Sequence, residues 1–576
     1  MRAALRFRLR LLSVAIILFA LLLILRLYFI QVVHGEEFAL KAERQYTKSA
    51  SALYDRGSIY FTRKDGTYLS GAGVSTGFKV ALAPDQLKDV DAAYTLIASH
   101  LAIDEAEFRE AAGKKGDPYE SIAVHVPEAA GQAIADAELP GVIVERDRWR
   151  TYPAGIAAAQ SLGFVAFDND DTLAGRYGLE RYYDDVLARK SEGLFGNFFA
   201  ELFANLNNVT GDGRSAREGD LITTLEPVVS EKLRQVLLET NAHYGSLETS
   251  GIIMNPKTGE IIALDSYPSY DPNDVAGSNA DHFGNPLVEH RHEFGSIVKA
   301  LTVASGIDAG VITPGTTYTD TGCITLNTKK ICNHDLKARG TASMQDVLSQ
   351  SLNLGVSFIS QRLGHEKMRN YVEKLGLGTE TGIDLPSEIS GDIENLRNSP
   401  RDVEYATAAF GQGIAMTPVE MIRALGTLAN DGALVTPHLV KAVRLESGIV
   451  KELSWGDSER VYAPETVQAT TRMLVHVVDN DLAGGRAMIP EMSVAAKTGT
   501  AQVADAGGGY SSYRYFHSFF GYFPAYDPEF IILLYTREPQ GVRYASETLT
   551  EPFFELTKFL ISYYDLPPDR AEAASE

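Results

Sequence analysis

The chain has 576 residues, which is enough for two or three domains. Its net charge is −22, from 53 Lys and Arg against 75 Asp and Glu, and this acidic balance argues against a nucleic-acid partner, which would need a basic surface. With only two cysteines, the chain is not a scaffold built on many disulfides.

The N-terminus has the pattern of a membrane anchor. Residues 1–10 contain four arginines and no acid, and residues 11–33 are largely apolar, with Arg26 and Gln31 toward the far end. This length suffices, because a spanning helix needs about 20 residues. A cleaved signal peptide is the alternative, but no clear small-x-small cleavage site follows. We expect an uncleaved transmembrane helix at 11–33, with a cytoplasmic tail at 1–10 and the remaining chain outside the membrane.

Residues 34–219 mix helix-like and strand-like stretches and contain no residues that we assign to catalysis. Glycines in Arg56-Gly-Ser-Ile59 and Gly178-Leu-Glu180 predict fixed turns. We hypothesise that Arg56 and Glu180 form an ion pair at the base of this region. The alternative is that both are ordinary surface charges.

Within this region, apolar residues recur at helical spacing between Leu194 and Leu206. They predict either a core helix or an amphipathic helix that rests on the membrane surface or receives a partner helix. The polar, glycine-containing residues 207–218 read as a linker, so the domain boundary is placed after residue 219.

From residue 220 to residue 566 the pattern predicts an α+β domain, a sheet covered by helices. Helices are expected at 228–240, over most of 297–430 and at 552–564. Strands are expected at 221–225, in a hairpin over 251–264, and at 492–497, 518–522 and 530–535.

Three short motifs carry the chemistry of this domain. Ser296 and Lys299 stand three apart at the start of an apolar, helix-compatible run, so that hydroxyl and amine can share one helix face. A serine needs a base to become a nucleophile, and a buried lysine with a lowered pKa can be that base. Ser351-Leu-Asn353 and Lys497-Thr-Gly-Thr500 follow. This order, S-x-x-K, S-x-N and K-T-G, is the signature of penicillin-binding proteins and β-lactamases.

The chain resembles the class B, monofunctional penicillin-binding proteins, the peptidoglycan D,D-transpeptidases of bacterial division and elongation. The agreement covers nearly the whole chain and includes, beside the three motifs, Arg56–Ile59, Gly178–Glu180, Tyr267–Asn273 and Gly411–Pro418. It implies a non-catalytic, dimerisation-like pedestal domain at 34–219, a penicillin-binding transpeptidase domain with an antiparallel sheet at 220–566, and a flexible tail at 567–576. Phe294 departs from the proline that the family commonly has before Gly-Ser.

The resemblance also implies a mechanism. Ser296 attacks the penultimate carbonyl of a stem peptide ending in D-alanyl-D-alanine, D-alanine leaves, and an amine of a neighbouring stem peptide takes the acyl group. Lys299 is the base, Ser351 relays a proton to the leaving amine, and Asn353 orients Lys299 and a substrate amide.

The K-T-G motif is expected to bind substrate. Lys497, Thr498 and Thr500 would hold its terminal carboxylate, and Gly499 would let an extended peptide lie along the strand. Backbone N–H groups of Ser296 and Thr500 would form the oxyanion hole. β-Lactams, which mimic the D-alanyl-D-alanine end, would inhibit covalently at Ser296, and no metal or organic cofactor is required.

Cys323 and Cys332 lie between the first two motifs. Outside the membrane they suggest a disulfide. A zinc site with His334 and Asp320 or Asp335 is the alternative, and free thiols are a third possibility. His290 and His292, just before the nucleophile, suggest a solvated or structural role, because no further metal ligand stands at a familiar spacing.

Two other functions share this pattern. One is a D,D-carboxypeptidase or β-lactamase-like hydrolase, and the other is a membrane-anchored sensor or scaffold with a silent site. The intact motif residues favour the transpeptidase. The resemblance implies membrane attachment and partners among cell-wall assembly proteins, including a polytopic glycosyltransferase.

Overall fold

The structure is a computed structural model that describes residues 55–167, 173–189, 218–505 and 509–570. Contacts divide the chain into two compact units, the smaller built mainly from residues 74–149 and the larger from 57–73, 150–188 and the chain from 218 onward. The domain limits predicted from the sequence, at residues 33, 219 and 566, stay predictions.

Several predicted features fall outside the described residues: the tail at 1–10, the anchor at 11–33, the helix at 194–206 and nearly all of the linker at 207–218. No helix among the described residues is long and apolar enough to cross a membrane.

At the C-terminus, Asp569 accepts a hydrogen bond from the Ser493 amide and Arg570 pairs with Asp479, so the predicted flexible tail begins with residues that contact the domain.

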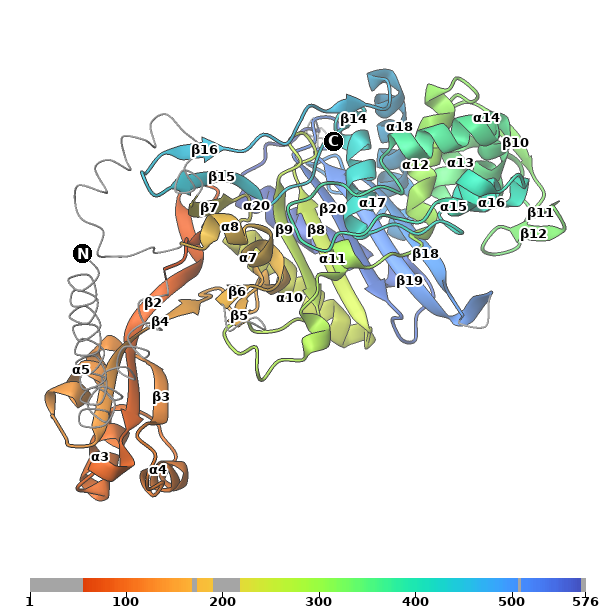
Figure 1. Ribbon diagram of the computed structural model, residues 1–576. Coiled ribbons are helices and arrows are strands. Elements are labelled where there is room, and N and C mark those ends of the chain that lie inside the picture. Colours follow the sequence, from red (N-terminus) through yellow and green to blue (C-terminus); the bar gives the residue numbers. More distant parts are fainter. Residues whose placement is uncertain (1–54, 168–172, 190–217, 506–508, 571–576) are drawn as a thin grey trace, which may run out of the picture. The chain divides into compact units, whose positions relative to one another are not determined.

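The smaller unit is a twisted sheet with helices packed against it (Figure 1). The later residues of β2 (Tyr68–Leu82) pair with β3 (Glu120–Val126) and with β4 (Val142–Thr151). The core combines strand residues such as Phe78 and Val80 with helix residues such as Ile97, Phe108 and Ile134. The helical elements are η2 (Pro84–Gln86), α3 (Val90–His100), α4 (Glu105–Ala112) and α5 (Glu128–Asp136), of which α3 and α4 begin at the aspartate N-caps Asp89 and Asp104.

The larger unit is organised around a five-stranded antiparallel sheet in the order β18-β19-β20-β8-β9. The strands are β8 (Glu248–Met254), β9 (Ile261–Tyr267), β18 (Ala495–Ala504), β19 (Tyr510–Phe523) and β20 (Phe530–Arg537). The expected hairpin over 251–264 and the three late strands are therefore confirmed. Because β18 is an edge strand, one side of the K-T-G motif has no strand neighbour among the described residues.

Helices cover both faces of this sheet (Figure 1). Side chains alternate along the strands, as the period of two requires. Ile253, Ile532 and Leu534 pack with α10 (Pro227–Tyr244) and α20 (Thr550–Tyr563) in one core, and Ile252, Ile531 and Leu533 belong to the other core. The predicted α+β fold is thus confirmed.

The second core contains the helices that carry the first two motifs. Its helices include α12 (Val298–Asp308), α13 (Met344–Ser349), α14 (Asn353–Lys374), α16 (Asp402–Ala408), α17 (Pro418–Gly426) and α18 (Pro464–His476), of which α12 carries Lys299 and α14 carries Asn353. Capping boxes start α13 at Ser343 and α17 at Thr417, so the sequence specifies both beginnings locally. The expectation of helix over most of 297–430 is wrong for 317–343 and for 375–393. The first segment forms two antiparallel strand pairs, β10 (Thr317–Asp320) with β13 (Gly340–Ser343) and β11 (Cys323–Leu326) with β12 (Lys329–Cys332), and the second contains no helix.

A second sheet in the larger unit joins segments that are distant in sequence. β7 (Gly219–Thr223) runs parallel to β1 (Ile59–Thr62) and antiparallel to β15 (Val440–Leu445), which pairs with β16 (Val450–Glu452). The remaining elements are β5 (Val165–Phe167), β6 (Leu173–Gly175), α6 (Ala159–Leu162), α7 (Gly178–Tyr182), α8 (Asp184–Leu187), η4 (Ala280–His282), α11 (Pro286–Glu289), η5 (Gly295–Ile297), α15 (Glu394–Asn398), η6 (Thr427–Ala429), β14 (Ala433–Leu434), β17 (Glu459–Arg460), η7 (Val477–Asp481), η8 (Leu482–Gly485) and α19 (Ala545–Thr548).

A buried ion pair lies beside this second sheet. Arg150 Nε donates to Glu180 Oε1 at 2.6 Å, and Arg150 Nη1 donates to the Gly57 carbonyl at 2.8 Å. The two side chains are 2% and 0% exposed. The pairing of Glu180 with Arg56 stays a prediction, and the structure adds Arg150 as a partner that the sequence did not reveal.

Candidate active site

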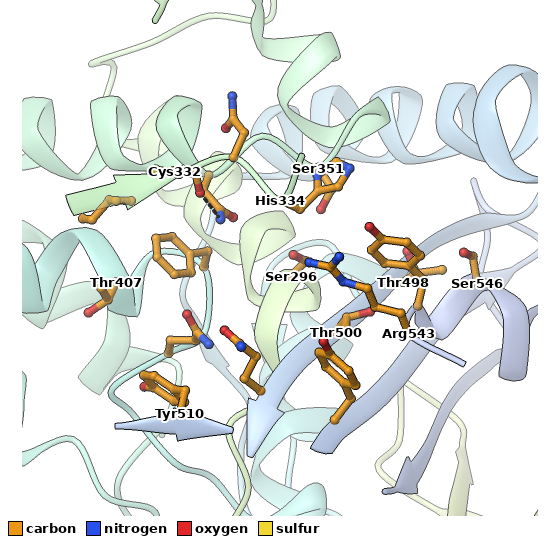
Figure 2. A pocket seen from close by; sticks show the side chains of 18 of the residues that line it. Ser296, Cys332, His334, Ser351, Thr407, Thr498, Thr500, Tyr510, Arg543 and Ser546 are labelled. Carbon is orange, nitrogen blue, oxygen red and sulfur yellow. Dashed lines mark hydrogen bonds between the residues drawn. The ribbon is translucent and has the colours of Figure 1, made fainter. Parts of the chain in front are cut away.

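The nucleophile Ser296 lies in the short helix η5 directly before α12, at the wall of a cavity of about 650 Å³ (Figure 2). Lys299, one helical turn later, is completely buried. Ser351, Asn353, Thr498 and Thr500 line the same cavity. The structure therefore brings the three motifs together, although they are spread over more than 200 residues.

Two glycines permit the turn before Ser296. Gly295 has φ +61°, and a Cβ there would stand 2.7 Å from the Thr500 carbonyl oxygen. Gly411 has φ +77°, its Cβ would stand 2.4 Å from the Gly295 carbonyl oxygen, and its own carbonyl accepts from the Gly295 amide. Three segments thus meet backbone to backbone at the nucleophile, which only glycine allows.

The unusual Phe294 is buried against Phe516, and its carbonyl accepts from Ser518 Oγ at 2.8 Å, so this departure from the family pattern is well packed.

We expect Gly411→Ala to destabilise the protein and to slow reaction at Ser296. A left-handed backbone costs a residue with a side chain about 1–3 kcal/mol, and here a backbone atom must also move. The measurements are thermal unfolding and the rate of labelling by a penicillin.

Gly413→Ala is the matched control for this substitution. Gly413 has the same φ of +77°, but its nearest atom to an added Cβ is the Thr407 hydroxyl at 3.3 Å. Equal effects of the two substitutions would show that the contact with Gly295 is unimportant.

The surroundings of Lys299 suit a general base. Its Nζ donates to the Ser351 carbonyl at 2.6 Å and to Ser351 Oγ at 3.2 Å. Burial lowers the pKa of Lys299 well below its ordinary value, and the nearby charge of Lys497 lowers it further. A neutral amine is therefore accessible, as removal of a proton from serine requires.

Ser351 lies between the two lysines. Lys497 Nζ donates to Ser351 Oγ at 3.2 Å and to the Thr498 carbonyl at 3.1 Å. Ser351, which stands between the end of α13 and the start of α14 in the chain, has φ +54°, a strained backbone conformation for a serine. Burial lowers the pKa of Lys497 to about 8. Ser351 Oγ can therefore pass a proton between the lysines and the cavity.

Asn353 begins α14 and is held by the hairpin β11–β12. Its Nδ2 donates to the Cys332 carbonyl at 2.8 Å (Figure 2). The hydrogen bonds that Lys299 Nζ donates within the described residues go to Ser351, and the orienting role predicted for Asn353 stays a prediction. Cys323 and Cys332 stand opposite each other on the hairpin and form a disulfide, which confirms that alternative over zinc ligation or free thiols.

The K-T-G motif lies on the edge strand β18. The Thr500 hydroxyl accepts a hydrogen bond from the Ala545 amide at 3.0 Å, which leaves its own proton free to be donated into the cavity. A Cβ at Gly499 would stand 2.6 Å from the Phe294 carbonyl and 2.3 Å from Ser518 Oγ. Glycine is thus needed here for packing against the nucleophile turn, a reason beyond the predicted accommodation of peptide.

The cavity also contains residues that the sequence did not single out as part of the site. His334 and Arg543 lie on the side of Ser351 and Thr498, and Tyr510 lies at the opposite end (Figure 2). The Tyr510 hydroxyl donates to Glu293 Oε1, which also accepts from the Gly413 amide. No local signal marks these residues, because they come from a hairpin and loops that only the fold brings to the cavity.

The fold and the site together define a penicillin-binding serine transpeptidase. A model of the penicillin-binding protein transpeptidase domain matches residues 249–557, more than half of the chain, and a model of the penicillin-binding protein dimerisation domain matches residues 54–193. The chain belongs to the penicillin-binding protein transpeptidase family.

Relatives agree with this assignment. The chain is 29% identical over 541 residues to stage V sporulation protein D of Bacillus subtilis, covering 92% of this chain and 81% of that protein. It is 24% identical over 467 residues to the peptidoglycan D,D-transpeptidase FtsI of Buchnera aphidicola, covering 79% and 77%. The crystal structure of penicillin-binding protein 3 from Mycobacterium tuberculosis complexed with ampicillin aligns with a TM-score of 0.65 and 27% identity, covering 74% of this chain and 92% of that one.

Proposed function

We propose that the protein is a peptidoglycan D,D-transpeptidase that cross-links stem peptides through an acyl-enzyme on Ser296 and is inhibited covalently by β-lactams. The observation that carries the proposal is the linkage of Lys299 and Lys497 through Ser351 Oγ beside the cavity that Ser296 lines. The D,D-transpeptidase name of one relative and the ampicillin complex of another support it.

In the acylation step, Ser296 Oγ attacks the penultimate carbonyl carbon while its proton passes to the neutral Lys299 amine. The bond to the terminal D-alanine then breaks, and its nitrogen leaves with a proton delivered through Ser351. The amine of a second stem peptide attacks the ester, the new amide forms, and Ser296 regains its proton. The burial of Lys299 and its contact with Ser351 support these roles.

The terminal carboxylate of the donor peptide would be bound by Lys497 with the hydroxyls of Thr498 and Thr500. A cation and two donors suit an anion, and the Thr500 hydroxyl has its proton free. The backbone N–H groups of Ser296 and Thr500 would stabilise the oxyanion, by about 3–4 kcal/mol per donor. The close approach of Gly295 to the Thr500 carbonyl supports this arrangement, because it keeps the two segments adjacent.

We further propose that residues 11–33 anchor the protein in the cell membrane, with the N-terminus in the cytoplasm and the catalytic domain outside. The arginines before the apolar stretch support this orientation. The disulfide at Cys323 and Cys332 supports an oxidising compartment for the catalytic domain. A polytopic glycosyltransferase and other cell-wall assembly proteins are the proposed partners.

The function is tested with the detergent-solubilised full-length protein and a fluorescent penicillin. We expect a stable adduct, which peptide mass spectrometry places on Ser296, and exchange of the terminal D-alanine of a stem-peptide donor for a labelled D-amino acid. Rapid loss of the label with release of hydrolysed penicillin would indicate a hydrolase. Folded protein that takes up no label and exchanges no D-alanine would indicate a silent scaffold.

A further inference from the structure

Three potential metal ligands meet at the start of β8, outside the cavity that contains the motifs. They are Glu248, His290 and His292, whose ligand atoms all lie within 4.8 Å of one another. His290 has extended backbone angles, His292 forms an antiparallel bridge with Met416, and the two rings lie near each other, with centroids 6.4 Å apart. The sequence offered no third ligand at a familiar spacing, and the fold supplies Glu248 from 42 residues upstream of His290.

The position of His292 is fixed by contacts that leave its ring nitrogen free for a ligand. Its backbone exchanges two hydrogen bonds with Met416, and its ring stacks on Phe516 at 4.6 Å. Among the contacts within the described part of the chain, His292 Nε2 is buried and has no hydrogen-bond partner.

Glu248 is the buried anion of this cluster. The Tyr535 hydroxyl donates to its Oε1, the kind of outer contact that orients metal-binding carboxylates. Its Oε2 lies 3.8 Å from His290 Nδ1 and 3.5 Å from Arg537 Nη1. Arg537 is thus the cation that pairs with the carboxylate, and its side chain is one-third exposed.

We propose that Glu248, His290 and His292 bind one Zn²⁺ ion. Two imidazoles and one carboxylate are a ligand set that zinc takes, with water in the remaining position. The ion replaces Arg537 at Glu248 Oε2. It ties the first residues of β8 to the segment that leads from His290 to Ser296, and it thereby stiffens the approach to the nucleophile.

The test is a zinc titration of untagged, metal-stripped full-length protein, followed by calorimetry and by the visible spectrum of bound Co²⁺. We expect one ion per chain and a tetrahedral or five-coordinate cobalt spectrum. Affinity should fall at least ~10-fold in Glu248→Gln, His290→Ala and His292→Phe. His292→Phe retains an aromatic ring on Phe516, and His290 is 52% exposed, so at least these two variants should fold.

His365→Phe is the matched control. His365 also stacks on an aromatic ring, Tyr405, and pairs with a carboxylate, Asp402 at 2.8 Å, but it does not belong to the three-ligand cluster. Its replacement should leave zinc affinity unchanged. Arg537→Gln should raise the affinity, because it removes the competing cation.

The proposal would be overturned if the protein bound no zinc, or if zinc binding persisted in both His290→Ala and His292→Phe. So would an affinity that does not rise in Arg537→Gln. Ser296→Ala should bind zinc as the wild type does, so the outcome is independent of the proposed transpeptidase activity.

Discussion

Replacing Ser296 with alanine is expected to abolish covalent labelling by a penicillin, and replacing Lys299 with methionine should slow labelling by about 10²–10⁴-fold. The first change removes the nucleophile. The second removes the amine that accepts its proton and leaves an apolar side chain of similar length in a fully buried position. The rate of adduct formation, measured by stopped flow or by timed gels, checks both effects.

Two substitutions serve as controls for this prediction. Ser546→Ala removes a hydroxyl from the same cavity without touching the lysines, and it should leave the labelling rate nearly unchanged. Lys299→Arg retains a positive charge that cannot be lost near neutral pH, so it should be as slow as the methionine variant. An arginine variant with near-normal rate would contradict the role of Lys299 as the base.

The same pair of lysines determines the pH dependence. Lys299 has its pKa lowered by burial and by Lys497, so Lys299 loses its proton first and the rate rises with pH through that pKa. Lys497, with a pKa of about 8, must keep its proton to bind the substrate carboxylate, so the rate falls above about pH 8. Lys497→Arg should remove the alkaline fall and retain the acidic rise. A wild-type profile without an acidic limb would contradict proton transfer to Lys299.

Replacing Glu180 with alanine is expected to lower the free energy of unfolding by about 3–5 kcal/mol. The substitution leaves the Arg150 guanidinium in a site where its side chain is only 2% exposed, without the carboxylate at 2.6 Å. The hydrogen bond that the Tyr152 hydroxyl donates to the same carboxylate oxygen at 3.3 Å is lost as well. Urea unfolding followed by circular dichroism measures the loss.

An exposed pair provides the comparison. Arg146 and Glu128 also form an ion pair, but their side chains are 63% and 54% exposed, so Glu128→Ala should cost less than about 1 kcal/mol. The double substitution Arg150→Met with Glu180→Leu should recover part of the stability lost in Glu180→Ala, because the Arg150 charge is then no longer buried without its carboxylate. Equal losses in Glu180→Ala and Glu128→Ala would show that burial does not strengthen the pair.

Much of the fold could be predicted because its signals are local. The turn residues Lys257-Thr-Gly259 between two apolar runs predicted a hairpin, and the apolar run after Lys299 predicted a helix that the structure contains as α12. The segment 317–343 was misjudged because its strands are only four residues long, too short for a period of two to stand out.

The sequence predicted which residues belong to the site better than it predicted the contacts that these residues make. Ser296, Ser351 and Asn353 line one cavity as expected, and the cysteines pair. The attachment of Asn353 to the Cys332 carbonyl and the place of Arg543 in the cavity could not be foreseen. Neither contact leaves a pattern in the sequence around the residues that make it.

The sequence by itself determined the class of chemistry, the α+β architecture and the residues of the three motifs, because short motifs and hydrophobic periods are properties of neighbouring residues. Only the tertiary structure decided that Ser351 bridges two lysines, that Arg150 neutralises Glu180 and that Glu248 joins His290 and His292. These contacts join segments up to about 150 residues apart, and packing alone removes such groups from water and brings them within reach of one another.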